Sequence, residues 1–136
     1  MKQDFPIPPY AAALGIELFG EENGVPVLCM NYGEHVMGRP GFLHGGAISG
    51  LLEMAAISAL MSALSASDPT AKIKPVNVTV DFMRGGMSQP TYAIGKITRL
   101  GGRLANIEAY TWQQDRQKFI AMAQMHYLIS REPKET

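Results

Sequence analysis

The feature that most constrains the fold of this chain is a long apolar segment, residues 45–64, which contains a single charged side chain, Glu53. Apolar residues recur there with the period of an α-helix and cover nearly every side of it. Such a helix is stable only when other elements bury it, so the chain must fold around this segment. A carboxylate in that setting costs free energy unless it is paired or used in function.

The tripeptide His44-Gly45-Gly46 leads into this helix. Glycines allow the backbone to approach another group closely, and the first residues of a helix carry N–H groups without intrahelical partners. These N–H groups and the helix dipole favour negative charge, such as the charge that develops on a carbonyl oxygen during acyl transfer. Nine residues beyond His44, Glu53 is a group able to act as a general base or as a nucleophile.

Segments with the alternation of β-strands surround the helix. Strands are expected at residues 15–19, 25–31, 76–82, 91–99, 104–113 and 119–129, with turns at 21–24, 101–102 and 114–117. A short helix is expected at residues 8–14, an ordered loop at 32–43 and the end of the long helix before 65–70. One long helix and about six mostly hairpin-linked strands predict an α+β domain in which an antiparallel β-sheet wraps around the helix.

Together these segments resemble the hotdog-fold acyl-CoA thioesterases, in particular the branch of the phenylacetate-pathway and hydroxybenzoyl-CoA thioesterases. The family pattern is His-Gly-Gly followed by a helix with Asp or Glu nine positions after the His, as at His44, Gly45, Gly46 and Glu53. The similarity also covers residues 76–84, 95–103 and 119–128. It implies a single hotdog thioesterase domain over residues 1–136, acting as a homodimer or a dimer of dimers with sites between subunits.

The resemblance also implies an activity, which is the hydrolysis of acyl-CoA, with an aromatic or medium-chain acyl group, to free acid and coenzyme A. In that activity the Gly45 N–H matches the oxyanion donor, and Glu53 matches the catalytic carboxylate, either as general base or as nucleophile. His44 would orient the loop or polarise the substrate carbonyl, or it would hydrogen-bond the backbone. Many family members carry an Asn six residues before the His, where this chain has Gly38. Asn31, His35 and Arg39 are the nearby polar candidates to replace it.

Further residues are candidates for binding the substrate. They are Gly46, His35 and Arg39 around the start of the helix, Ile57 on its apolar side, and Arg84, Arg99 and Arg103 near strand ends and turns. Arginine suits the phosphates of coenzyme A because it presents paired donors and keeps its charge. The alternative for these arginines is an ordinary solvated position at a strand edge.

Composition argues against several other classes of protein. Lys plus Arg and Asp plus Glu number 12 each, so the net charge is zero and no basic patch for nucleic acid is expected. The single cysteine, Cys29, cannot form an internal disulfide, which favours a cytoplasmic location. Three scattered histidines lack the spacing of metal ligands, so neither metal nor cofactor is expected. Residues 1–6 lack the apolar core of a signal peptide, and Glu53 and the small residues make the long helix a buried one rather than a membrane span.

Two other functions remain open from the sequence. One is a hotdog dehydratase or hydratase acting on acyl-carrier or acyl-CoA substrates, in which His35 would work with Glu53. The other is a non-catalytic acyl-CoA-binding hotdog protein, for which the glycine at position 38 is the support.

Overall fold

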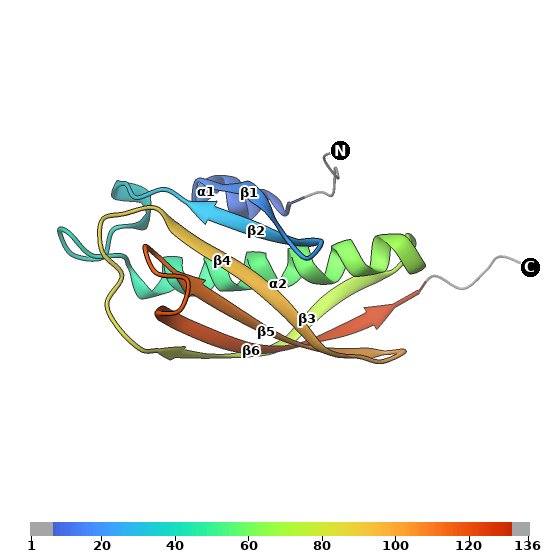
Figure 1. Ribbon diagram of the computed structural model, residues 1–136. Helices are drawn as coiled ribbons and strands as arrows, with labels where there is room; N and C mark the ends of the chain where they lie inside the picture. The colour runs from blue at the N-terminus through green and yellow to red at the C-terminus, as the bar shows by residue number, and fades with distance from the viewer. Residues whose placement is uncertain (1–6, 132–136) are drawn as a thin grey trace, which may run out of the picture.

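Six strands form one antiparallel sheet that curves around one long helix in this computed structural model, which describes residues 7–131 (Figure 1). The order of the strands across the sheet is β1-β2-β4-β5-β6-β3. The elements are α1 (Pro9–Ala13), β1 (Ile16–Glu22), β2 (Val25–Met30), the short 3-10 helix η1 (Glu34–Val36), α2 (Gly45–Ser67), β3 (Lys72–Phe82), β4 (Thr91–Leu100), β5 (Leu104–Trp112) and β6 (Phe119–Ser130). The predicted α+β class and the hotdog arrangement of sheet and helix are confirmed. Residues 1–6, which carried the argument against a signal peptide, lie outside the described part of the chain.

The long helix α2 is buried on most of its surface, as its composition predicts. Leu51, Leu52, Ala55 and Leu60 have no exposed surface, whereas Glu53 is only half-buried. Figure 1 shows the helix lying in the concave side of the sheet along its length. The helix is long and apolar enough to span a membrane by length and composition, but 67% of its most apolar window is buried inside the protein, which identifies it as the core helix.

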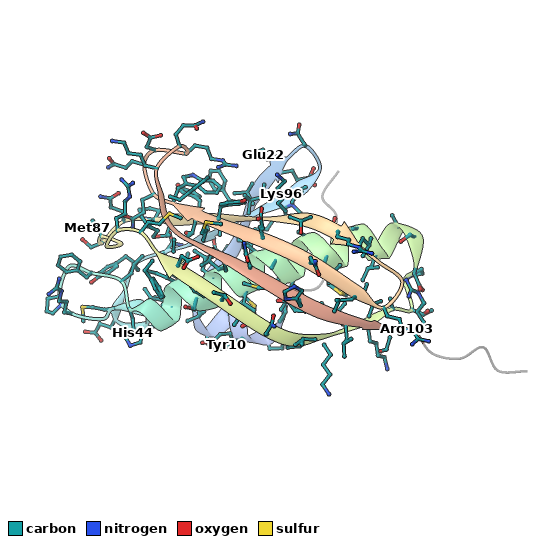
Figure 2. All side chains as sticks on the ribbon, turned by 90° about the horizontal axis from the view of Figure 1, so that it is seen from below. Tyr10, Glu22, His44, Met87, Lys96 and Arg103 are labelled. Carbon is teal, nitrogen blue, oxygen red and sulfur yellow. The ribbon has the colours of Figure 1, made fainter. Side chains whose placement is uncertain are left out.

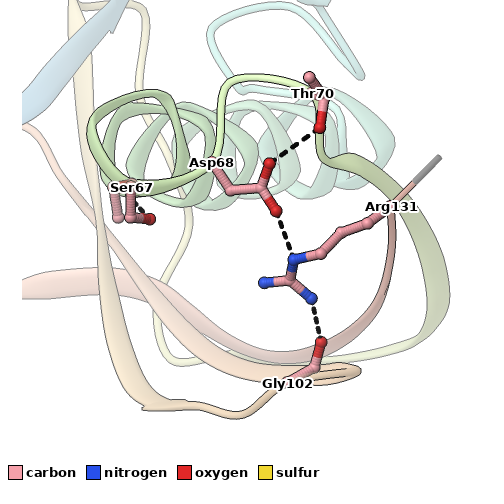
Figure 3. Close-up of polar contacts among 6 residues, drawn as sticks. Ser67, Asp68, Thr70, Gly102 and Arg131 are labelled. Carbon is pink, nitrogen blue, oxygen red and sulfur yellow. Dashed lines mark hydrogen bonds and ion pairs between the residues drawn. The ribbon is translucent and has the colours of Figure 1, made fainter. Parts of the chain in front are cut away.

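The helix ends three residues later than predicted, since residues 65–67 continue it and Asp68 caps it. The sequence pattern predicts a break at the serines there, but serine is tolerated in a helix, and the first proline comes only at Pro69. At this end Thr70 Oγ1 donates to Asp68 Oδ1 at 2.9 Å, and Arg131 donates to the other carboxylate oxygen and to the Gly102 carbonyl (Figure 3). These bonds fix the end of α2 to the end of β6 and to the β4–β5 turn.

A close approach at Gly95 sets the distance between α2 and the sheet. A Cβ atom on Gly95 of β4 would lie 2.7 Å from the Ala55 carbonyl oxygen and 2.9 Å from the Ala59 Cβ. Because two of the nearest atoms are helix backbone, no side chain could move aside. Gly95 is therefore a packing requirement, with small residues on both elements.

The β1–β2 turn is shorter than the predicted turn at residues 21–24. Glu21 and Glu22 continue β1, and only Asn23 and Gly24 form the turn, with φ angles of 53° and 80°. Positive φ at both central residues is the geometry of a two-residue hairpin turn that matches the twist of the strands. The Asn-Gly pair alone is thus sufficient to reverse the chain.

The edge strand β3 exposes apolar side chains. It pairs only with β6 among the described strands, and Val76, Val78 and Phe82 are 52%, 50% and 54% exposed. An unpaired strand edge with exposed apolar residues is a surface that proteins usually cover. The alternation predicted for residues 76–82 is present, but a single chain leaves its apolar face largely uncovered.

Candidate functional site

The start of α2 is organised by His44, the N-cap residue of the helix. Its extended backbone (φ −70°, ψ 136°) lets its Nδ1 accept a hydrogen bond from the Gly46 N–H at 2.8 Å. A Cβ on Gly46 would lie 2.9 Å from that nitrogen, so glycine at this position allows the cap to form. Because Nδ1 is the acceptor, a neutral His44 carries its proton on Nε2, where it can donate outward. The imidazole is thus a structural cap with one free donor.

Gly45 differs from Gly46 because its backbone N–H donates no hydrogen bond within the described chain. No described residue accepts a hydrogen bond from the Gly45 N–H, whereas that of Gly46 is taken by His44. Gly45 borders a cavity of about 340 Å³ together with Phe42, Phe82, Arg39 and Arg84. A free N–H at a helix start, on a residue that borders a cavity with two arginines, is a position suited to an anionic or polarised oxygen.

The carboxylate of Glu53 projects from a half-buried strip of α2. Ile57 lies one turn further along the same side, and it too is half-buried. No described residue forms a hydrogen bond or an ion pair with Glu53. Glu53 is the one charged residue of an otherwise uncharged helix and has no structural partner there.

Tyr127 on β6 lies beside Glu53 in the interior. Its side chain is 1% exposed, and its hydroxyl donates only to the Met125 sulfur, at 3.4 Å. Burial, and secondarily the Glu53 carboxylate, raise the pKa of Tyr127, so the phenol remains protonated. A thioether is a weak acceptor, so this buried donor is only weakly satisfied.

Gly45 and Glu53 are separated along the same helix. Eight residues at about 1.5 Å each place their backbones about 12 Å apart along the axis. Glu53 does not border the cavity at Gly45. One chain therefore provides the free N–H and the carboxylate at two distinct places on α2.

The four candidate arginines divide between the two ends of the molecule. Arg39 and Arg84 border the cavity at Gly45, and the Arg39 guanidinium lies 4.2 Å from the centre of the Phe42 ring. Arg99 lies near the end of β4 and Arg103 in the turn that follows, at the opposite end of the sheet. Figure 2 shows Arg103 at the end of the molecule away from His44 and Met87. Within one chain, only Arg39 and Arg84 are near the start of α2.

Two of the other polar candidates, Asn31 and His35, do not border the cavity at Gly45. A Cβ on Gly33 would lie 2.7 Å from the His35 ring and one on Gly15 2.8 Å from it, so this histidine packs between two glycines of the loop and β1 start. His35 borders none of the four cavities described in this part of the chain. At Gly38 a Cβ would lie 3.1 Å from the His44 Cα, so a larger side chain would press on the capping residue. Of the three candidates to replace the family Asn, only Arg39 borders the Gly45 cavity.

Two residues near the site were not anticipated from the sequence. The sequence predicts Phe82 only as one of the alternating apolar residues of a strand, yet its ring lies 3.6 Å from the position of a Cβ on Gly45. It predicts Tyr127 only as part of the last strand. Both come from strands far from residues 44–53 in sequence, and apolar alternation alone does not show which strand residues face the helix start.

The remaining reactive groups have structural surroundings. Burial, with a smaller effect of Glu17, raises the pKa of the Cys29 thiol, which disfavours the reactive thiolate. Among residues 7–131, no group of three or more His, Cys, Asp or Glu side chains could hold a metal ion.

Comparison with known proteins identifies the family. The model of the thioesterase superfamily matches residues 40–120, and the chain belongs to that superfamily. This range contains His44, Gly45 and Glu53, and membership makes the protein a thioester hydrolase. No curated protein matches the sequence.

Solved structures support the same fold. A protein from Chromobacterium violaceum is 31% identical, with 90% of this chain and 83% of that chain covered and a TM-score of 0.70. A thioesterase from Haemophilus influenzae is 15% identical, covers 96% of this chain and 94% of its own, and has a TM-score of 0.80. A thioesterase family protein from Silicibacter pomeroyi is 22% identical, with 92% and 91% covered and a TM-score of 0.78. The last two likenesses concern the fold alone.

Proposed function

We propose that this thioester hydrolase acts on acyl-coenzyme A, releasing a free aromatic or medium-chain acid and coenzyme A. The observation that carries the proposal is the unpaired N–H of Gly45, a residue that borders a cavity together with Arg39 and Arg84. The two arginines suit the phosphates of coenzyme A, and the apolar residues Phe42, Phe82 and Ile48 suit an acyl group. A single domain and a cytoplasmic location remain expectations from the sequence.

The reaction needs an oxyanion donor and a base. In our proposal the thioester oxygen accepts a hydrogen bond from the Gly45 N–H, at the positive end of the α2 dipole. Glu53 takes a proton from water as the water oxygen bonds to the carbonyl carbon. The C–S bond then breaks, and the thiolate leaves with the proton returned by Glu53. Direct attack by Glu53, giving a mixed anhydride that water then hydrolyses, is the other route open to the same residues.

We further propose that the site contains Gly45 of one subunit and Glu53 of another. The separation of about 12 Å along α2 is long for two groups that must act on one carbonyl. Antiparallel pairing of two copies of α2 would place each Gly45 beside a Glu53 of the partner. The uncovered β3 edge and its exposed Val76, Val78 and Phe82 favour such an assembly.

A hydrolysis assay across acyl-CoA esters tests the function. Aromatic, short, medium and long acyl-CoA esters are compared by the release of free thiol, with an enoyl-CoA included to detect hydration. We expect turnover of at least one aromatic or medium-chain ester and no hydration product. Hydrolysis of acyl-carrier-protein thioesters only, with none of acyl-CoA, would contradict the proposed substrate class.

A further inference from the structure

The loop between β3 and β4 forms one wall of the cavity at Gly45. Residues 83–86 of this loop border the cavity, and Arg84 is one of its two arginines. Gly85 and Gly86 have no side chains that could anchor the loop, so other groups must hold it in place. The shape of the cavity therefore depends on what fixes this loop.

The same loop contacts the residues that lead into α2. The Leu43 N–H donates to the Gly86 carbonyl at 2.9 Å, and Phe42 and Met87 form an isolated β-bridge. A Cβ on Gly86 would lie 2.6 Å from the Leu43 Cδ1, so the two segments are in close contact. Because Leu43 is only two residues before Gly45, a displacement of the loop would also displace the Gly45 N–H.

The loop is held by the side chain of Gln113, the residue that directly follows β5. Gln113 Nε2 donates to the Met87 carbonyl at 2.9 Å, and Gln113 Oε1 accepts from the Met87 N–H at 3.0 Å. The side-chain amide thus pairs with both backbone groups of one loop residue, as a neighbouring strand would. Figure 2 shows Met87 at the same end of the molecule as His44.

A third hydrogen bond fixes the orientation of this amide. Gln113 Nε2 also donates to Thr91 Oγ1 at 3.1 Å, while the hydroxyl of the buried Thr91 donates to the Gln89 carbonyl at 3.1 Å. With the amide reversed, its nitrogen would face the Met87 N–H, so only one orientation satisfies the network. A glutamate has the same size, but it would lose both donated bonds and place a carboxylate oxygen against the Met87 carbonyl. The position therefore requires an amide.

Gln113 does not border the cavity at Gly45. It borders a neighbouring cavity, which it shares with Arg84, Gly85 and Met87. A substrate bound at Gly45 would therefore be affected by Gln113 only through the loop.

We propose that Gln113 is a positioning residue for thioester hydrolysis. Its amide fixes Met87, and the loop in turn fixes Leu43 and Arg84, so that the Gly45 N–H and the wall of the cavity keep the arrangement that the reaction needs. The proposal rests on the proposed site at Gly45, but it depends neither on the acyl group nor on the subunit that supplies Glu53.

Kinetics of variants at position 113 test the proposal. For the thioester that wild type hydrolyses fastest, Gln113→Glu and Gln113→Leu should lower kcat about 10- to 100-fold, the scale of loss that a displacement of about 1 Å can cause. The kcat is measured per folded subunit, at a temperature at which circular dichroism shows each variant folded. Gln114→Glu is the matched control, because it places the same charge beside the same cavity at a residue without a described hydrogen bond. It should keep the wild-type kcat.

A purely structural role of Gln113 gives a different result. It would lower the denaturation midpoint of Gln113→Glu and leave kcat per folded subunit at the wild-type value, which would overturn the proposal. An equal loss of kcat in Gln114→Glu would overturn it as well, since the added charge would then be the cause. If Gln113→Leu does not fold, Gln113→Glu, which has the same size as wild type, decides the question.

Amide hydrogen exchange tests the positioning of the loop without a substrate. In Gln113→Glu the Leu43 N–H should exchange about tenfold faster, because opening of the loop then breaks fewer hydrogen bonds, whereas the Leu52 N–H inside α2 should be unchanged. Unchanged exchange at Leu43 would overturn the proposal whatever the substrate is. Failure of the proposed substrate class would be seen differently, as a wild-type protein that cleaves other thioesters but no acyl-CoA.

Discussion

At the scale of single residues, Glu53 has the surroundings of a functional group rather than a structural one. It is half-buried, has no hydrogen-bond or ion-pair partner among the described residues, and lies beside the buried phenol of Tyr127. A carboxylate kept in this position without a partner reduces stability rather than increasing it. We therefore propose that function is the reason for an acid in this helix.

Glu53→Gln and Glu53→Ala should each lower kcat by at least about 100-fold, the usual loss on removing a positioned acid or base. Both variants should keep the fold, because no described contact depends on the carboxylate. Steady-state hydrolysis and circular dichroism measure the two effects. Wild-type turnover in Glu53→Gln would show that the carboxylate is not catalytic.

Gly45 allows a test of the oxyanion donor. Gly45→Pro deletes the N–H at a position where proline is compatible with a helix, so kcat should fall about 10²–10³-fold with the helix intact. Gly45→Ala is the control: it keeps the N–H, and its Cβ would meet the Phe82 ring at an ordinary 3.6 Å. Equal activity of the two variants, both folded, would remove the oxyanion role from Gly45.

Tyr127 gives the protein a predictable sensitivity to alkaline pH. Its pKa in the folded state is raised by burial and by Glu53, so the stability linked to its protonated form is complete below the ordinary tyrosine pKa of about 10. That stability is lost as pH rises above this value. Chemical denaturation at pH 8 and pH 11 should therefore show a smaller alkaline loss for Tyr127→Phe than for wild type. Tyr10→Phe, whose ring is 53% exposed, is the control, and an identical loss in all three proteins would contradict the assignment.

At the scale of elements, the contact between α2 and β4 depends on Gly95. Gly95→Ala should destabilise the protein by about 1–3 kcal/mol, the usual cost of overpacking, because its Cβ would lie 2.7 Å from the Ala55 carbonyl oxygen. Gly102→Ala has nothing within 4 Å of its Cβ and should change stability little. Urea denaturation compares the two, and an unchanged midpoint for Gly95→Ala would show that α2 can move away from the sheet without cost.

Most elements could be predicted from the sequence because their signals are local. The strands at 91–99, 104–113 and 119–129 follow from alternation between glycine or polar turns, and each lies within a residue or two of the observed bounds. The end of α2 was placed too early, at residue 64, because three polar or small residues resemble a break. The neighbours of β3 could not be predicted, since its pairing with β6 joins residues about 40–60 positions apart, and non-local pairing leaves no local sequence signal.

The candidate site was predictable only in part, for the same reason. Gly45, Gly46 and His44 lie in one short motif, and the structure indeed places them together at the helix start. Arg39 and Arg84 border one cavity, whereas Arg99 and Arg103 lie at the other end of the sheet. These positions depend on the paths of four separate segments of the chain. The periodicity of a sequence shows on which face of a helix or strand a residue lies, but it does not show which residues of other elements will lie beside it.

At the scale of the whole molecule, a single chain holds the two proposed catalytic groups too far apart to form one site. The free N–H at Gly45 and the carboxylate of Glu53 lie at different places on α2, and the β3 edge exposes Val76, Val78 and Phe82. A symmetric assembly would account for both observations. It would cover the β3 edge, and it would bring Gly45 of one subunit close to Glu53 of another. The protein should therefore sediment as a dimer or a larger even assembly at micromolar concentration.

The most direct test of this account is the activity of a mixed dimer made from Glu53→Gln and Gly45→Pro subunits. Each variant alone should be nearly inactive. If Gly45 of one subunit works with Glu53 of the other, the mixed dimer contains one intact site and one doubly altered site. Purified with two different tags, it should then show about half of the wild-type kcat per dimer. Activity no higher than that of either parent variant, in a folded and verified mixed dimer, would contradict the shared site.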